Sequence, residues 1–305
     1  MRRLSLPFVA VLATLGGSAV ADEAAPPPPV LVIAKEEIKP GQMGPHEKNA
    51  AHFVAIQNKA NAGMHRLGLT PVSGDDNVVV YIEGYPSFAE MEKANKAFGE
   101  ALAANAALAA ELDQNTAQGA NMHASQKTSL AVYRPDLSFR PAHMDVVAKS
   151  RYFGITTTHL KIGHTPDYEA YTKQLNAGRE KANADWIHTA VYQVVSGAPA
   201  GTFLTFTLYG SLAEWDEATA KMSERNKAVD TALGGDEVVK ERRKQAGEIM
   251  ADTSSALFAM TPTISRPGPT FVAYDAGFWT PKAAAEAKAL ASKKEKAAPK
   301  ATEKQ

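Results

Sequence analysis

The fold of this chain is decided by two stretches of sequence, HRLGLTPVSG at residues 65–74 and HTAVYQVVSG at residues 188–197. Both begin with histidine, alternate apolar and polar residues in the middle and end in Ser-Gly, and the second begins 123 residues after the first. Alternation that ends in a turn residue indicates a β-strand. Each stretch therefore predicts a strand, and their likeness indicates an internal duplication.

Three further pairs of segments support the duplication. They are EIKPG (37–41) with HLKIG (159–163), YPSFAEM (85–91) with YGSLAEW (209–215), and PDLS (135–138) with PTIS (262–265). The four pairs keep the same order along the chain, and their offsets stay between 122 and 127 residues. A chain of 305 residues has room for two units of about 125 residues, an ordinary domain size. We predict a first unit over 30–145 and a second over 146–281.

Within each half the pattern predicts the order β-α-β-β-α-β. In the first half we expect strands at 30–39, 65–73, 77–85 and 128–133, with helices at 44–62 and from Ser87 to about residue 124. In the second half we expect strands near 152–162, 187–196, 202–209 and 255–260, with helices that begin at Thr165 and Ser211. Ser87 with Glu90, and Ser211 with Glu214, have the spacing of a capping box, which predicts the start of the second helix in each half.

This element order is that of the ferredoxin-like unit, an antiparallel sheet with both helices on one face. Two such units in one chain resemble the dimeric α+β barrel superfamily, and the tandem arrangement is most similar to exported bacterial members without assigned chemistry. That superfamily includes antibiotic-biosynthesis monooxygenases, NIPSNAP-type and EthD-type proteins, chlorite dismutases and dye-decolourising peroxidases. The resemblance implies an α+β fold in which two tandem ferredoxin-like units form an intrachain dimeric α+β barrel. It does not imply a particular reaction.

Strand alternation divides the side chains between the two faces of each sheet. Val80 and Ile82, like Leu204 and Phe206 in the second half, form an apolar set that we expect to pack on the helices. The other faces are expected to enclose a shared interior, in which apolar and polar groups together bind a small organic molecule. The residues assigned to this interior are Lys35, Glu37, Val79, Tyr81, Glu83, Thr157, His159, Phe203, Thr205 and Thr207. The alternative is that Glu37, Glu83 and His159 lie at strand ends and meet water at the barrel mouth.

His65 and His188 occupy equivalent positions at the start of the repeated strand. A matched pair of imidazoles could bracket a ligand pocket, and histidine changes its charge in the physiological pH range. The alternative is a pair of structural residues inherited through the duplication. Both are secondary candidates for ligand binding.

The composition and the histidine spacing exclude several kinds of site. The chain has no cysteine, which excludes iron–sulfur clusters, thiolate zinc sites and covalently attached c-type haem. His46 and His52 are six residues apart and fall on opposite sides of a helix, so no metal site is predicted, and no cofactor either. Non-covalent haem is an alternative that would require His52, His123 or His159, because the predicted helices of the second half contain no histidine.

The sequence assigns no reaction, and whether the protein is an enzyme stays open. We predict a module that binds a small organic ligand. One alternative is a cofactor-free, monooxygenase-like enzyme, in which His159 or Glu83 would be the first candidate for a general base. A haem-binding protein and a structural scaffold are the others.

The two ends of the chain carry the signals for its location. Residues 1–21 have a basic start, an apolar run and the ending Ala19-Val20-Ala21, which predicts a signal peptide cleaved after Ala21 and a periplasmic or secreted protein. Residues 22–29 are expected to form a Pro-rich linker and 282–305 a disordered Ala/Lys-rich tail. No later segment is long and apolar enough to span a membrane, and 33 basic against 33 acidic residues give no reason to expect a nucleic-acid partner. Pairing into a homodimer is left open.

Overall fold

The computed structural model describes residues 25–280 of the chain. The predicted signal peptide and the predicted Ala/Lys-rich tail lie outside the described residues. Within residues 25–280, no helix combines the length and the apolar character that crossing a bilayer requires.

Eight antiparallel strands close into one barrel. The strands are β1 (Val30–Ile38), β2 (Arg66–Pro71), β3 (Val78–Tyr85), β4 (His123–Tyr133), β5 (Tyr152–Leu160), β6 (Ala190–Ser196), β7 (Thr202–Tyr209) and β8 (Met250–Met260). Around the barrel their order is β1-β3-β2-β8-β5-β7-β6-β4. Each half contributes a four-stranded ferredoxin-like sheet, β4-β1-β3-β2 or β8-β5-β7-β6, so the predicted fold class is confirmed.

The two sheets are joined along both edges. Leu69 of β2 lies opposite Met260 of β8, and Val132 of β4 lies opposite Gln193 of β6. An unpaired sheet edge exposes backbone donors and acceptors, and barrel closure removes all of the edges. The duplication therefore completes within one chain the pairing that a single ferredoxin-like unit would leave open.

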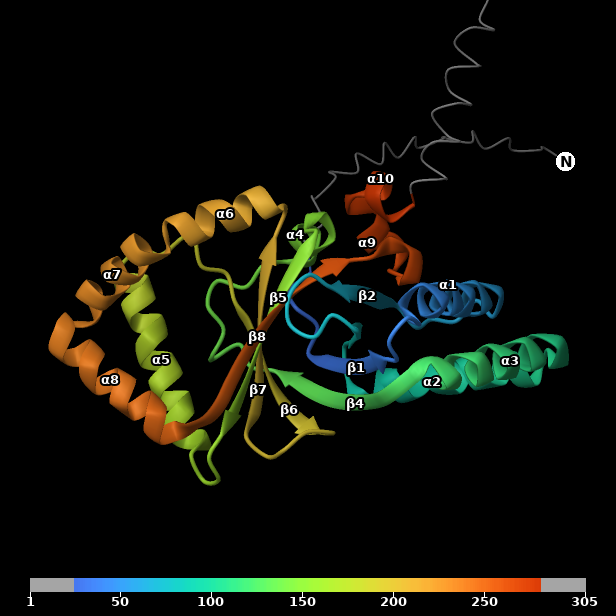
Figure 1. The fold of residues 1–305 in the computed structure, drawn as a ribbon, viewed down its shortest axis with the longest axis horizontal. Helices are drawn as coiled ribbons and strands as arrows, with labels where there is room; N and C mark the ends of the chain where they lie inside the picture. The colour runs from blue at the N-terminus through green and yellow to red at the C-terminus, as the bar shows by residue number, and fades with distance from the viewer. Residues whose placement is uncertain (1–24, 281–305) are drawn as a thin grey trace, which may run out of the picture.

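The helices cover the outside of the barrel in two groups, one for each half (Figure 1). The first group is α1 (Met43–Lys59), α2 (Phe88–Ala103) and α3 (Ala106–Met122), and the second is α5 (Thr165–Lys181), α6 (Leu212–Ala220), α7 (Met222–Leu233) and α8 (Asp236–Ile249). The short helices α4 (Met144–Lys149), α9 (Pro269–Tyr274) and α10 (Ala276–Trp279) and the 3₁₀ turn η1 (Pro262–Ile264) follow the last strand of each half.

Local sequence signals explain where the helices begin and where the long ones break. The hydroxyls of Ser87 and Ser211 accept hydrogen bonds of 3.2 Å from the amides of Glu90 and Glu214, as the capping pattern predicts. The single long helix expected in the first half is divided in two, because the Asn105 side chain caps a new helix. The last strand of each half begins five residues earlier than expected, since its first five residues are exposed or half-buried and lack the alternation that indicates a strand.

The predicted assignment of the β3 and β7 faces is wrong, and the strand register shows why. Ile33 of β1 pairs with Ile82 of β3, so these two residues share a face. Ile33 alternates in step with Lys35, which the sequence interpretation placed in the interior, whereas it placed Ile82 against the helices. Phe206 of β7 packs in one core cluster with Ile33 and Ile82, across the barrel interior. The apolar set Val80, Ile82, Leu204 and Phe206 therefore fills the barrel and does not face the helices.

The helices cover the other face of each sheet, which on β3 and β7 carries the more polar set of residues. Tyr81 and Val79 pack in a cluster with Ala50 of α1, and Phe203 packs against Tyr168 of α5. The same face carries three further residues that alternate in step with these: Glu83, Thr205 and Thr207. The sequence analysis expected these three, together with Val79, Tyr81 and Phe203, in the barrel interior, and the structure corrects that position. Alternation separates two faces but does not say which is enclosed. The barrel interior is enclosed by both sheets at once, so it takes the more apolar set.

Candidate functional site

A cavity of about 770 Å³ lies at one end of the barrel, where β1 and β5 begin and β3 and β7 end. Its walls come from both halves of the chain, and they are predominantly apolar. The wall residues from the strands include Leu31, Ile82, Phe153, Ala190, Tyr192, Phe206 and Leu208. The cavity is thus the part of the barrel interior that the core cluster does not fill.

Two segments outside the repeated strands cover this end of the barrel. Pro26–Pro29, expected only as a linker, borders the cavity from one side, and α9 borders it from another. The Tyr192 hydroxyl donates a 2.9 Å hydrogen bond to the Pro28 carbonyl, which holds the proline run against β6. The Trp279 indole donates a 2.8 Å bond to the Ala148 carbonyl, which holds the α9–α10 segment against α4. The proline run and α9 thus form two of the cavity walls.

The two repeat-related histidines, His65 and His188, both line this cavity, at exposed positions on its rim. The Nδ1–H of His188 donates a 2.7 Å hydrogen bond to the Arg140 carbonyl, since a carbonyl oxygen can only accept, so the Nε2 of the neutral ring is free of the proton. Partial burial, followed by the nearby charge of Arg266, lowers the pKa of His65, so its imidazole is neutral at pH 7. The structure brings these secondary candidates together around one cavity; their role in binding stays a prediction.

The tyrosines of the cavity wall are hydrogen-bonded and hold their protons. The Tyr85 hydroxyl donates a 2.7 Å bond to Glu83, and burial together with this bond raises the pKa of Tyr85. Burial likewise raises the pKa of Tyr192. Both side chains therefore present neutral, mainly aromatic surface to the cavity and are poorly suited to act as bases.

None of the ten primary candidates from the sequence lines the cavity. Four of them alternate in step with Ile33 and Ile155 but lie toward the opposite end of the barrel: Lys35, Glu37, Thr157 and His159. There Lys35 faces Asp75 at 3.7 Å, Glu37 accepts a bond from Ser125, and His159 bonds the hydroxyl of Thr202. A role of these four residues in ligand binding stays a prediction. The sequence interpretation missed the cavity because its cover comes from segments outside the repeat.

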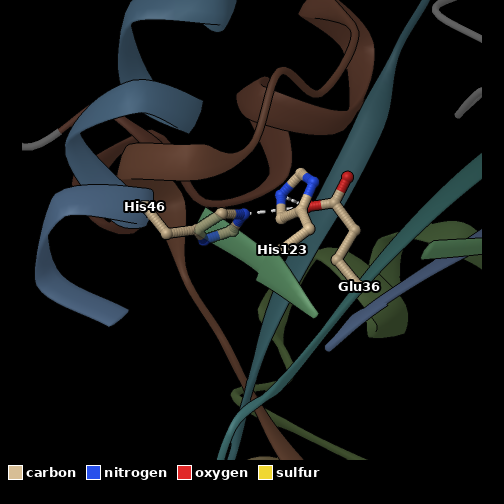
Figure 2. A group of neighbouring side chains, drawn as sticks. All are labelled: Glu36, His46 and His123. Carbon is tan, nitrogen blue, oxygen red and sulfur yellow. Dashed lines mark hydrogen bonds and ion pairs between the residues drawn. The ribbon is translucent and has the colours of Figure 1, made fainter. Parts of the chain in front are cut away.

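A second group of chemically active side chains lies outside the cavity, under α1. Glu36 from β1, His46 from α1 and His123 from the start of β4 converge there, and both imidazoles approach the Glu36 carboxylate (Figure 2). The His46 Nε2 lies 2.8 Å from the Glu36 Oε2, and the His123 Nε2 lies 3.4 Å from the same oxygen. Burial lowers the pKa of His123 and outweighs the opposing effect of Glu36, so this imidazole is neutral at pH 7. Carboxylate and neutral imidazole are both metal ligands.

Comparisons with known proteins give similarity at the level of the fold. No family model and no curated protein matches the sequence. Among solved structures, an anthrone oxidase-like protein has a TM-score of 0.48 at 11% identity, and the alignment covers 78% of this chain and 93% of that chain. A candidate monooxygenase from Lactobacillus acidophilus gives 0.43 at 10% identity, covering 76% and 93%. A chlorite dismutase variant from Candidatus Nitrospira defluvii gives 0.42 at 10% identity, covering 77% and 92%.

These identities are too low to transfer the role of any residue. The architecture is established by the strand order and the closed barrel of the chain itself. The chain has the dimeric α+β barrel fold, with both ferredoxin-like units in a single polypeptide.

Proposed function

We propose that this protein binds a small, predominantly apolar organic molecule in the cavity at the end of the barrel. The observation that carries the proposal is a cavity of about 770 Å³ with aromatic and aliphatic walls and two imidazoles on its rim. Sites for small molecules typically have about 300–1,000 Å³ and mostly apolar walls, with a few polar groups that fix orientation.

The walls and the rim would contribute differently to binding. Phe206 stands nearly perpendicular to both Phe153 and Tyr192, with ring centroids 6.0 and 5.6 Å away, so the three rings form a fixed aromatic wall. A flat apolar ligand that packs against such a wall gains dispersion energy and buries apolar surface. The Nε2 of His188 can accept a hydrogen bond from a ligand hydroxyl or amide at the rim. The apolar wall would supply most of the affinity and the histidines the orientation.

The experiment fills the cavity and measures binding of a fluorescent apolar probe, 1-anilinonaphthalene-8-sulfonate. Ala190 pairs with Phe206 and lines the cavity, so Ala190→Trp places an indole where the ligand would lie. We expect the probe to bind the wild type and to bind Ala190→Trp at least tenfold more weakly. The matched control is Ala89→Trp on the exposed surface of α2, which should bind like the wild type. Equal probe binding by all three proteins would contradict the proposal.

Haem is a second candidate occupant because of the geometry of His188. Its Nδ1 is held by the Arg140 carbonyl, and this second hydrogen bond is the usual way in which a protein orients a metal-ligating imidazole. His188 would bind the haem iron through its Nε2, and the apolar wall would contact the porphyrin. Haem titrated into the purified protein would give a Soret band that His188→Gln shifts or removes. An unchanged spectrum in that variant would exclude His188 as the ligand.

We also propose that the chain is exported with removal of residues 1–21. The Ala25 carbonyl accepts a 2.9 Å hydrogen bond from the Met144 amide, and this contact lies in the part of the chain that cleavage after Ala21 would retain. The intact mass of protein recovered from a bacterial periplasm should correspond to a chain that begins at Asp22. A mass that retains Met1 would contradict this.

A further inference from the structure

The group formed by Glu36, His46 and His123 is buried between β1, α1 and β4. Only 3% of the His46 side chain is exposed, against 12% for Glu36 and 17% for His123. Among the described residues, the Nε2 of His123 is a buried nitrogen atom without a hydrogen-bond partner, and it faces the Glu36 carboxylate. Buried polar atoms normally have partners, because desolvation without a hydrogen bond costs about 1–3 kcal/mol per group.

The second half of the chain shows that the fold does not need these side chains. His46 and Tyr168 are each the fourth residue of the first helix of their half. His123 and Met250 each begin the last strand, at the place where its register against the first strand shifts. Glu36 and Thr158 lie two residues before that shift on the first strand.

The equivalent position in the second half is therefore occupied by Thr158, Tyr168 and Met250. There Tyr168 packs with Phe203 and Ile249 in an ordinary apolar cluster, with Met250 against it. The same backbone framework thus encloses an uncharged set of side chains in one half and a carboxylate with two imidazoles in the other. The ionisable set is a property of the first half and not a requirement of the fold.

We propose that Glu36, His46 and His123 bind one divalent transition-metal ion of the Zn²⁺ class. One carboxylate oxygen and two imidazole nitrogens, all within 4.8 Å of one another, form the donor set. Ligand atoms about 2.0–2.1 Å from a tetrahedral zinc ion lie about 3.3–3.4 Å apart. The 3.4 Å between His123 Nε2 and Glu36 Oε2 already matches this spacing. The 2.8 Å between His46 Nε2 and Glu36 Oε2 would need to open by about 0.5 Å.

The surroundings of the group fit this use. Gln126 donates a 2.9 Å hydrogen bond to the Glu36 Oε1, which fixes the carboxylate and leaves the Oε2 directed at the imidazoles. Such second contacts are typical of metal-binding carboxylates. The three residues leave a fourth coordination position, and the partial exposure of His123 allows water to reach it. None of the three lines the barrel cavity, so the site is separate from the one proposed above.

The test measures Zn²⁺ binding by the purified chain, without a histidine tag, after metal has been removed with a chelator. Zn²⁺ is titrated in competition with a chromophoric zinc indicator, and Co²⁺ gives a visible spectrum that reports the ligands. We expect the wild type to bind one ion per chain. The triple variant Glu36→Thr, His46→Tyr, His123→Met copies the second half and should bind at least a hundredfold more weakly. His52→Ala is the matched control, because His52 also lies on α1 and contacts a glutamate at 2.8 Å.

The outcomes are distinct. Retention of one Zn²⁺ by the wild type and by His52→Ala, with loss in the triple variant, supports the site. Binding by the wild type that is no tighter than in the triple variant overturns it. If the triple variant does not unfold cooperatively, His123→Met alone replaces it and should weaken binding at least tenfold. Probe binding in the barrel cavity should be unchanged in every one of these variants, so that failure of this proposal and failure of the proposed function can be told apart.

Discussion

Phe203 and Phe206 provide a direct test of which face of β7 points into the barrel. They are three residues apart on the same strand, and both side chains are almost fully buried. Phe206 belongs to the core cluster that residues of both halves form in the barrel interior, whereas Phe203 contacts Tyr168 of α5 on the outside. Replacing each by leucine removes the same ring from the same strand but from opposite faces.

The structure gives the size of each effect. Phe206 makes two nearly perpendicular ring contacts, with Phe153 and Tyr192, and Phe203 makes one tilted contact with Tyr168 at 4.6 Å. An aromatic pair contributes about 0.5–1.5 kcal/mol beyond its buried area. Phe206→Leu should therefore lower the free energy of unfolding by about 1–3 kcal/mol from lost ring contacts, and Phe203→Leu by about half as much.

Binding separates the two variants more sharply than stability does. Phe206 lines the cavity and Phe203 does not, so only Phe206→Leu removes part of the ligand wall. We expect its affinity for 1-anilinonaphthalene-8-sulfonate to fall about fivefold, which corresponds to about 1 kcal/mol of lost contact. Urea unfolding followed by circular dichroism measures stability, and a fluorescence titration measures binding. If Phe203→Leu weakens binding of the probe as much as Phe206→Leu does, the assignment of the β7 faces derived from the strand register is incorrect.

Three further predictions concern single contacts. Hydrogen bonds from Arg134 lower the pKa of Asp136 from 3.8 to about 2, so Asp136→Asn should lower the free energy of unfolding by about 1 kcal/mol at pH 7 after screening. A lowered carboxyl pKa stabilises the fold fully above pH 3.8, and this stabilisation is lost as the pH falls through 2. The difference between variant and wild type in urea unfolding should therefore shrink below pH 3.8 and vanish below pH 2. Gly197 has φ of +87°, and a Cβ there would lie 2.1 Å from the Thr128 carbonyl oxygen. Gly197→Ala should therefore lower the free energy of unfolding by about 3 kcal/mol and lower Tm. An unchanged Tm would refute this. Ser211→Ala removes a helix cap and should cost about 1 kcal/mol in the same unfolding assay, whereas no change would show that the cap contributes nothing.

Much of the fold could be predicted from the sequence because its signals are local or repeated. The matched segments beginning at His65 and His188 revealed two units, and Ser87 and Ser211 marked helix starts through their own hydrogen bonds. Alternation along β3 and β7 also separated the two sets of side chains correctly. The sequence interpretation failed where a decision depended on partners distant in the chain, as for the side of the sheet on which the helices lie.

The barrel cavity and the group formed by Glu36, His46 and His123 also depend on residues that are distant in the chain. The cavity needs Pro26–Pro29 and α9 to meet at one end of the barrel, and those segments are more than 230 residues apart in the sequence. Glu36, His46 and His123 come from three different elements, and a search for closely spaced ligands along one helix could not find them. Comparison of the two halves position by position would have given a signal, because Thr158, Tyr168 and Met250 occupy the equivalent places.

The sequence by itself determined the duplication, the order of elements in each unit and the two alternating sets of strand residues, since each depends on neighbours along the chain. Only the tertiary structure decided which set fills the barrel, where a cavity is left, and that a carboxylate meets two imidazoles under α1. Those outcomes depend on strand register and on closure of the barrel, which are set by the packing of residues far apart in the sequence.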